Sequence, residues 1–208
     1  MNANYSLKVE ALSKHFDRTL LFENISFSLS DGEVFAITGW NGAGKSTLIR
    51  IIAGLSRPTS GRIEMAADGK ATTPESRRRF FGLVAPAFSL YEELTGFENL
   101  KFFCMVRGVP CSRSGCLELM ERVGLDKRPD KLCRDYSSGM KQRLKLVQAI
   151  VHQPPLLLLD EPGTNLDSNG LKILAGIISE QRQKGMTIIA SNERREVEYA
   201  DRVINLPG

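Results

Sequence analysis

The octapeptide Gly39-Trp-Asn-Gly-Ala-Gly-Lys-Ser46 carries the strongest structural signal in this chain of 208 residues. It fits the pattern G-x-x-x-x-G-K-[S/T] and follows Val34–Ile37, a run that is apolar on both faces, as in a buried parallel strand. Its glycines let the backbone N–H groups of residues 42–46 converge on a phosphate, and the N-terminus of the next helix adds partial positive charge. The octapeptide therefore predicts a phosphate-binding loop, or P-loop, between a strand and a helix.

The same loop predicts how a nucleotide and its metal ion are held. Lys45 is expected to bridge the β- and γ-phosphates, and the hydroxyl of Ser46 is expected to ligate Mg²⁺. The alternative, a glycine-rich turn without a ligand, does not explain why a buried strand precedes the loop and a helix follows it. The predicted nucleotide contacts within this segment are Gly39, Trp40, Asn41, Gly42, Ala43, Gly44, Lys45, Ser46 and Thr47.

A second motif, Leu156-Leu-Leu-Leu-Asp-Glu161, predicts a buried strand that ends in two carboxylates. In a parallel sheet this strand delivers both carboxylates to the edge that carries the P-loop. Asp160 is expected to contact Mg²⁺ or a water bound to it, and Glu161 to accept a proton from the attacking water. A strand that ends in Asp-Glu is by itself usually a solvated end, but the P-loop favours the catalytic interpretation.

A third segment, Tyr136-Ser-Ser-Gly-Met140, opens a helix that is predicted over residues 138–151. Ser137, Gly139 and the exposed N–H groups of the first helical turn can bind an anion. Taken alone, the segment is interpreted as an ordinary helix cap.

The order of the predicted elements indicates an α/β fold. Strands are expected at residues 34–37, 156–159, 187–190 and 202–206, and helices at 95–107, 114–123, 138–151 and 168–183. Near the N-terminus, Leu7, Val9 and Ala11 alternate as the inward side of a further strand, as do Ile25, Phe27 and Leu29. The prediction is one domain over residues 1–208, with an α/β core from 1–85 and 153–208 and a helical insertion at 86–152.

The composition excludes few functions, but it indicates the class of protein and its cellular compartment. The net charge of +4 and the apolar fraction of 42% are ordinary for a globular protein, and no apolar run is long enough to span a membrane. The four cysteines, Cys104, Cys111, Cys116 and Cys133, form no Cys-x-x-Cys pair and are expected to be reduced thiols, partly in the core. We expect a cytoplasmic protein that binds no nucleic acid, and read the basic run 77–79 as a solvated helix end.

Together these motifs resemble the ATP-binding subunit of ABC transporters over essentially the whole chain. Residues 39–46 resemble its Walker A loop, 156–161 its Walker B motif, 136–140 its signature motif and 163–167 its D-loop. The resemblance implies a P-loop NTPase core, RecA-like, with a parallel or mixed sheet, flanking helices and an N-terminal antiparallel β subdomain, interrupted by a helical subdomain that carries the signature. It also implies ATP with Mg²⁺ as the ligands and a homodimer or heterodimer of ABC subunits, arranged head to tail.

The resemblance assigns further residues to the nucleotide. Ser137, Ser138, Gly139 and Met140 would contact the ATP of the partner subunit, and Asp167 would belong to the D-loop at the same interface. Phe16 would stack on adenine; the alternative is a core phenylalanine in an edge strand.

Several positions depart from the family pattern. Pro86 aligns with the Q-loop glutamine and has no side-chain oxygen for Mg²⁺, and Ser138 and Tyr136 replace a glycine and a leucine of the signature. Asn192 aligns with the switch histidine; its amide can donate to a γ-phosphate oxygen but cannot carry charge or pass on a proton. We therefore expect Glu161, Lys45 and Asn192 to form the catalytic set, with slow hydrolysis.

The function implied is ATP hydrolysis that drives a separate membrane-spanning subunit from the cytoplasmic face of the membrane. Residues 85–98 would be the docking surface, with Phe88 and Tyr91 either as anchors or packed within the helical insertion. The compact size and the segment 90–100 are more typical of exporter subunits, including the haem-exporter type. The alternatives are a degenerate regulatory ATP-binding subunit, and a non-transport ABC protein that acts on nucleic acid.

Overall fold

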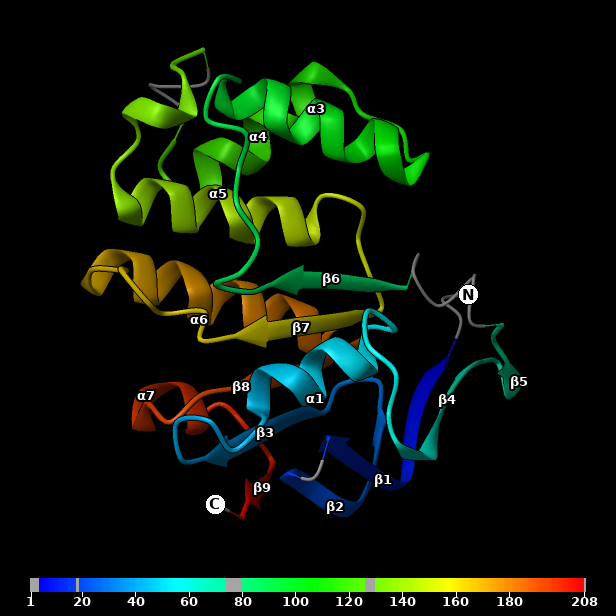
Figure 1. Cartoon of the computed structure of the whole chain (residues 1–208). Helices are drawn as coiled ribbons and strands as arrows, with labels where there is room; N and C mark the ends of the chain where they lie inside the picture. The colour runs from blue at the N-terminus through cyan, green and yellow to red at the C-terminus, as the bar shows by residue number, and fades with distance from the viewer. Residues whose placement is uncertain (1–3, 18, 74–79, 126–129, 208) are drawn as a thin grey trace.

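The computed structural model describes residues 4–17, 19–73, 80–125 and 130–207, which form two sheets and a group of helices (Figure 1). The basic run 77–79 lies outside the described residues. The antiparallel sheet has the strand order β2-β1-β4-β5 and the parallel sheet the order β6-β7-β8-β3-β9. The α/β prediction is therefore confirmed, with strand pairings that join the two ends of the chain.

The elements have the following bounds. The antiparallel strands are β1 (Tyr5–Phe16), β2 (Thr19–Ser30), β4 (Ser60–Ala67) and β5 (Lys70–Ala71). The parallel strands are β3 (Val34–Gly39), β6 (Phe81–Val84), β7 (Leu156–Asp160), β8 (Met186–Ala190) and β9 (Arg202–Leu206). The helices are α1 (Lys45–Ile52), α3 (Gly96–Arg107), α4 (Arg113–Arg122), η1 (Cys133–Asp135), α5 (Ser138–Ile150), α6 (Ser168–Arg182) and α7 (Arg194–Val197).

The parallel sheet separates two hydrophobic cores, because successive side chains of a strand point to opposite faces. Leu156 and Leu158 of β7 face α1 and the antiparallel sheet, whereas Leu157 and Leu159 face the helices α3, α4, α5 and α6. Figure 1 shows these two groups of elements on opposite sides of the parallel sheet. The helices α3, α4, α5 and α6 consequently share one hydrophobic core with the parallel sheet.

Local signals explain most of the element boundaries. Thr95 caps α3 through its side chain, which accepts from the N–H of Glu98, while the Glu98 carboxylate accepts from the N–H of Thr95. This is the capping box that the sequence predicts. Gly108 ends the same helix in the left-handed conformation, with φ 64°.

The expected alternation of β1 is wrong at one residue. The alternation predicts Ala11 on the inward side with Leu7 and Val9, but it is exposed and lies in a β-bulge with φ 47°. Its N–H donates to Ser26 Oγ. The extra residue shifts the side-chain alternation, so that Leu12 is buried in place of Ala11.

The three parallel strands β3, β7 and β8 end at Gly39, Asp160 and Ala190 on the same edge of the sheet. A crevice at the carboxyl ends of strands is where open α/β sheets bind their ligands. In the described part of the chain, none of the helices combines the length and the apolar character that crossing a bilayer demands.

Candidate functional site

The P-loop joins the end of β3 to the start of α1, and two of its glycines are required by the backbone. Gly44 has φ 98°, and a Cβ there would lie 2.7 Å from Leu21 Cγ. Gly39 has φ 146°, and a Cβ there would lie 2.9 Å from the carbonyl oxygen of Leu206. A side chain at either position would strain the backbone and collide with its neighbour, so the loop keeps this path only with glycine.

Lys45 is buried inside the curve of this loop. Its side chain is 6% exposed, and Nζ donates to the carbonyl oxygens of Gly39 at 2.6 Å and of Trp40 at 3.2 Å. The ammonium group therefore lies within the loop whose backbone N–H groups define the predicted phosphate site. Contact of Lys45 with phosphate stays a prediction.

Ser46 and Asp160 bring together two motifs that are 114 residues apart in the sequence. Ser46 Oγ, in the first turn of α1, donates to Asp160 Oδ1 at the end of β7 over 3.0 Å. Asp160 is 2% exposed; burial raises the pKa of its carboxyl, and the hydrogen bond from Ser46 offsets this only in part. The pair offers a hydroxyl and a carboxylate, which are oxygen ligands of the kind that Mg²⁺ takes.

Glu161 leaves the strand in an unusual conformation. Its φ of 48° is in the left-handed region, which costs a non-glycine residue about 1–2 kcal/mol. Its N–H nevertheless donates to the carbonyl oxygen of Ala190 over 2.9 Å, so the residue stays attached to the end of β8. The left-handed turn breaks the alternation of β7 and leaves Glu161 exposed next to the buried Asp160.

Asn192 lies directly against the P-loop. It follows β8, and its Oδ1 accepts a hydrogen bond from the N–H of Gly39 over 3.1 Å. A cavity of about 480 Å³ opens here, lined by Thr38, Gly39, Trp40, Asn41, Asn192 and Asn205. The side-chain oxygen of Asn192 is thus engaged by the loop, and only its NH₂ group is left to act as the donor that the sequence predicts.

The signature segment and the D-loop contact each other within the chain. Ser137 is the N-cap of α5, and its hydroxyl accepts from the N–H of Met140 over 3.2 Å. Ser138 is exposed beside it, and a Cβ on Gly139 would lie 2.9 Å from the carbonyl oxygen of Asn165. In the described conformation the helix-cap interpretation of Ser137 is therefore correct.

Asp167 is a helix cap, and Phe16 is exposed to solvent. Asp167 caps α6, where its Oδ1 accepts from the N–H of Gly170 over 2.7 Å. Phe16 is 53% exposed at the end of β1, with Lys14 Nζ 4.6 Å from the centre of its ring. The alternative that Phe16 packs in the core is therefore wrong, because about half of the residue's surface is exposed.

The structure adds residues that the sequence reasoning missed. Glu196 is 3% exposed, and its Oε1 accepts from the N–H of Gly163 over 2.9 Å. Gln142 is also buried and donates through Nε2 to the carbonyl oxygen of Pro162 over 2.8 Å. Glu196 stands in the charged run 193–198, which on composition alone indicates a solvated surface.

The cysteines are free, as predicted, and Cys104, Cys116 and Cys133 are buried. Burial raises the pKa of Cys133 to about 11, as expected of thiols that pack as small core residues. Across the described ranges, no group of three or more His, Cys, Asp or Glu residues could hold a metal ion.

Comparison with known proteins identifies the family. The sequence pattern of the family described as "ABC transporter" matches residues 22–164. The chain is 38% identical over 197 residues to the lantibiotic transport ATP-binding protein SrtF of Streptococcus pyogenes, covering 93% of this chain and 82% of that protein. It is 32% identical over 206 residues to the cytochrome c biogenesis ATP-binding export protein CcmA of Mannheimia succiniciproducens, covering 99% and 96%.

A solved structure titled "Structure of ATP binding subunit of ABC transporter" superposes with a TM-score of 0.83 at 32% identity, covering 96% of this chain and 85% of that one. The ABC family implies ATP binding, normally with Mg²⁺, and ATP hydrolysis. The chain belongs to the ABC transporter family and has the P-loop NTPase fold of its ATP-binding subunits.

Proposed function

We propose that this chain binds and hydrolyses ATP to drive export through a separate membrane-spanning subunit. The observation that carries the proposal is the convergence of Lys45, Ser46, Asp160 and Glu161 at one edge of the parallel sheet. These are the residue types that hold phosphates, a divalent cation and an attacking water in P-loop enzymes.

The donor set fits a magnesium ion. Asp160 is a buried carboxylate whose only side-chain hydrogen bond among the described residues comes from Ser46, so a cation at these two oxygens would stabilise its charged form. Bound there, Mg²⁺ would neutralise part of the charge on the phosphates. Lys45 must exchange the carbonyl oxygens of Gly39 and Trp40 for phosphate oxygens, which a short movement of a flexible side chain achieves.

Glu161 is the proposed general base. It is exposed at the end of β7, one residue after the metal-binding carboxylate, and can accept the proton of the attacking water. Asn192 would donate from its NH₂ group to the γ-phosphate while its oxygen stays on Gly39. Pro86 supplies no side-chain oxygen, so we infer that hydrolysis is slow.

The proposed dimer is head to tail, with two copies of this chain or one copy and another ABC subunit. Ser137, Ser138, Gly139 and Met140 would then contact the ATP of the partner subunit, and Asp167 would lie at the same interface. Phe16 would stack on the adenine of the ATP bound to its own P-loop; its exposed ring supports this.

The proposed docking surface for the membrane subunit is the segment 85–98. Phe88 is 46% and Tyr91 54% exposed, although Tyr91 also packs edge to face on Phe102 with ring centres 4.9 Å apart. A pocket of about 300 Å³ is lined by Ser89, Leu90 and Glu92 of this segment and by Ser138 and Lys145 of α5. Glu92 pairs with Lys141, and no carboxylate of the described residues forms an ion pair with Lys145. Its charge suits an acidic side chain on a cytoplasmic segment of the membrane subunit, which would place this chain on the cytoplasmic face.

The export direction is supported by one relative, CcmA of Mannheimia succiniciproducens, which is named a cytochrome c biogenesis ATP-binding export protein. A second candidate function is regulatory: a subunit that binds ATP with little hydrolysis. The absence of a Q-loop glutamine at Pro86 and of a histidine at Asn192 favours it.

Steady-state ATPase activity separates these two functions. The purified chain, with and without its membrane subunit, would be compared with a Glu161→Gln variant, which keeps the shape of the side chain but not its basicity. We expect slow turnover that the variant loses by about a hundredfold or more. Equal rates for the two proteins, with ATP binding retained, would instead establish the regulatory function.

A further inference from the structure

The short segment from Ser191 to Glu196 connects the P-loop to the turn that follows Glu161. At one end, Asn192 Oδ1 accepts from the N–H of Gly39. At the other end, Glu196 Oε1 accepts from the N–H of Gly163. Because these side chains lie on one short stretch of chain, the position of the P-loop and that of the turn depend on each other.

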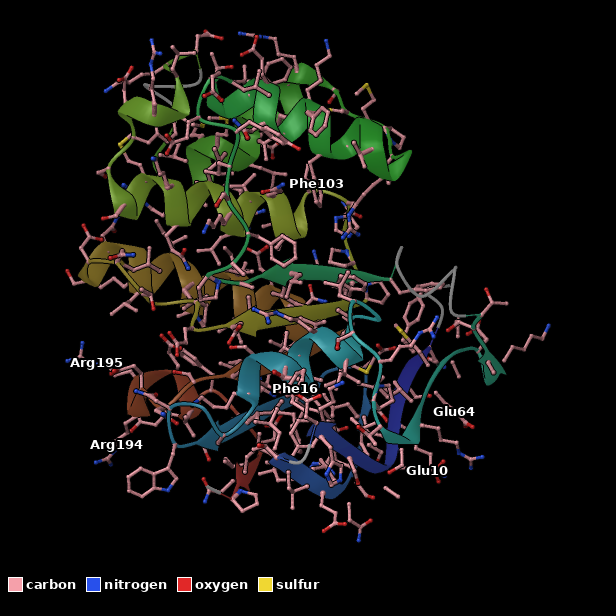
Figure 2. The ribbon with its side chains drawn as sticks, in the orientation of Figure 1. Glu10, Phe16, Glu64, Phe103, Arg194 and Arg195 are labelled. Carbon is pink, nitrogen blue, oxygen red and sulfur yellow. The ribbon has the colours of Figure 1, made fainter. Side chains whose placement is uncertain are left out.

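Glu196 is a buried carboxylate, and burying its negative charge costs free energy. Its helix α7 has its two arginines, Arg194 and Arg195, pointing outward into solvent (Figure 2), whereas Glu196 is 3% exposed. Burial raises the pKa of the Glu196 carboxyl, and hydrogen bonds with Ser191 and Gly163 lower it only in part. Its Oε2 has no hydrogen-bond partner among the described residues, so the carboxylate is held by Ser191 and by the N–H of Gly163.

The contact with Gly163 is close. A Cβ added to Gly163 would lie 2.1 Å from Glu196 Oε1, so the carboxylate packs directly against the backbone. The turn itself closes through hydrogen bonds from the N–H of Thr164 to the carbonyl oxygen of Glu161 and from the N–H of Leu166 to that of Gly163. Glu196 therefore holds the turn in which Glu161 keeps its left-handed conformation.

We propose that Glu196 is a positioning residue for ATP hydrolysis, which acts by holding the Gly163 N–H and so fixing where the carboxylate of Glu161 stands relative to the P-loop. The inference rests on the proposed function, in which Glu161 is the general base. The competing explanation is that Glu196 only stabilises the fold.

The test uses the full chain with three substitutions. Glu196→Ala removes the acceptor, Glu196→Gln keeps an acceptor oxygen without the charge, and Gln181→Ala is the matched control. Gln181 is 1% exposed and donates from Nε2 to the carbonyl oxygen of Pro154 over 2.8 Å, so its loss also removes one buried bond between side chain and backbone. It lies at the far end of α6 from the D-loop.

Three quantities are measured: kcat and KM for ATP, the midpoint of thermal unfolding, and hydrogen–deuterium exchange of the peptide covering residues 162–166. For Glu196→Ala we expect kcat to fall about ten- to a hundredfold with KM little changed, since a small displacement of the base slows the chemical step. Exchange in 162–166 should become faster. Glu196→Gln should recover both values to within about threefold, because its amide oxygen still accepts from Gly163.

The control separates positioning from stability. Gln181→Ala should lower the unfolding midpoint but leave kcat and the exchange of 162–166 as in the original chain. The proposal is overturned if kcat of Glu196→Ala is unchanged, or falls no more than that of Gln181→Ala. It is also overturned if Glu196→Gln is as slow as Glu196→Ala. Glu161→Gln is measured alongside. If this variant loses activity, the proposed function holds even where the results for Glu196 overturn its positioning role.

Discussion

Asn192 stands at the position where the family resemblance predicts a histidine. A histidine here would present a ring nitrogen that can carry charge. Asparagine offers only a neutral NH₂ group, because its side-chain oxygen already accepts a hydrogen bond from the N–H of Gly39. We predict that Asn192→His raises kcat for ATP hydrolysis by about ten- to a hundredfold, which corresponds to one charge-assisted contact in the transition state.

The measurement is steady-state ATPase activity together with ATP affinity. Asn192→Ala serves as the comparison, because it removes both the donor and the bond to Gly39. A rate for Asn192→His that equals that of the original chain would place residue 192 outside the reach of the γ-phosphate.

His152 is a single residue that makes the stability of the folded chain depend on pH. Burial and the nearby Arg107 lower the pKa of His152 from 6.5 to about 4, and its Nε2 lies 3.1 Å from the carbonyl oxygen of Phe81. The folded chain thus keeps His152 neutral while the unfolded chain takes up a proton below pH 6.5, so stability is lost as pH falls from about 6.5 to about 4.

His152→Gln cannot titrate and should lose less stability over this range. We expect the difference to be on the order of 1–2 kcal/mol, because the site is partly exposed and solvent screens the charge. Urea unfolding at pH 7 and pH 4.5 measures it. His15→Gln, at an exposed position, is the control and should follow the original chain.

At the scale of elements, the contact of β6 with α5 sets how the helices sit on the sheet. Gly82 lies where the strand meets the end of the helix, and a Cβ there would be 1.9 Å from the carbonyl oxygen of Ala149. We predict that Gly82→Ala destabilises the chain by about 1–3 kcal/mol or more, because neither backbone can yield without disturbing the shared core.

Gly176 is the matched control for this substitution. It lies within α6, where a Cβ would have open space and the backbone is helical. Gly176→Ala should therefore stabilise the chain by about 0.5–1 kcal/mol. Equilibrium denaturation of both variants measures the two effects, and a Gly82→Ala variant as stable as the original chain would show that α5 can move away from β6.

At the scale of the whole molecule, the parallel sheet carries the nucleotide site at its carboxyl edge and the helical layer on one face. The proposed docking segment 85–98 joins the two, since it leaves β6 and enters α3. A force on this segment would therefore reach both the helices and the sheet edge. This arrangement suits the coupling of hydrolysis to a membrane partner.

A substitution at Lys145 tests whether this chain docks to the membrane subunit through the proposed surface. We predict that Lys145→Glu weakens association with the membrane subunit, because an acidic partner would be repelled. Lys101→Glu, on an exposed position of α3, is the control with the same change in charge. Co-purification with the membrane subunit is the measurement, and equal recovery of both variants would contradict the assignment of the pocket.

Local patterns were sufficient to predict a large part of the molecule. The P-loop, the strand Leu156–Asp160 and the capping box at Thr95 depend on residues close together in the chain, and each has the expected conformation. Parallel pairing also explains why Ser46 and Asp160 meet, since the carboxyl ends of parallel strands share one edge.

The remaining features depend on contacts between distant segments, which no local pattern contains. The bulge that exposes Ala11 involves the neighbouring strand, and the burial of Glu196 within a charged run depends on the backbone of Gly163. The hydrogen bond of Asn192 to Gly39 likewise joins residues 153 positions apart. The sequence by itself thus determined the class of fold and the nucleotide motifs through short-range chemistry, and only the tertiary structure decided how those motifs are held together, because burial and long-range hydrogen bonds exist only once the chain has packed.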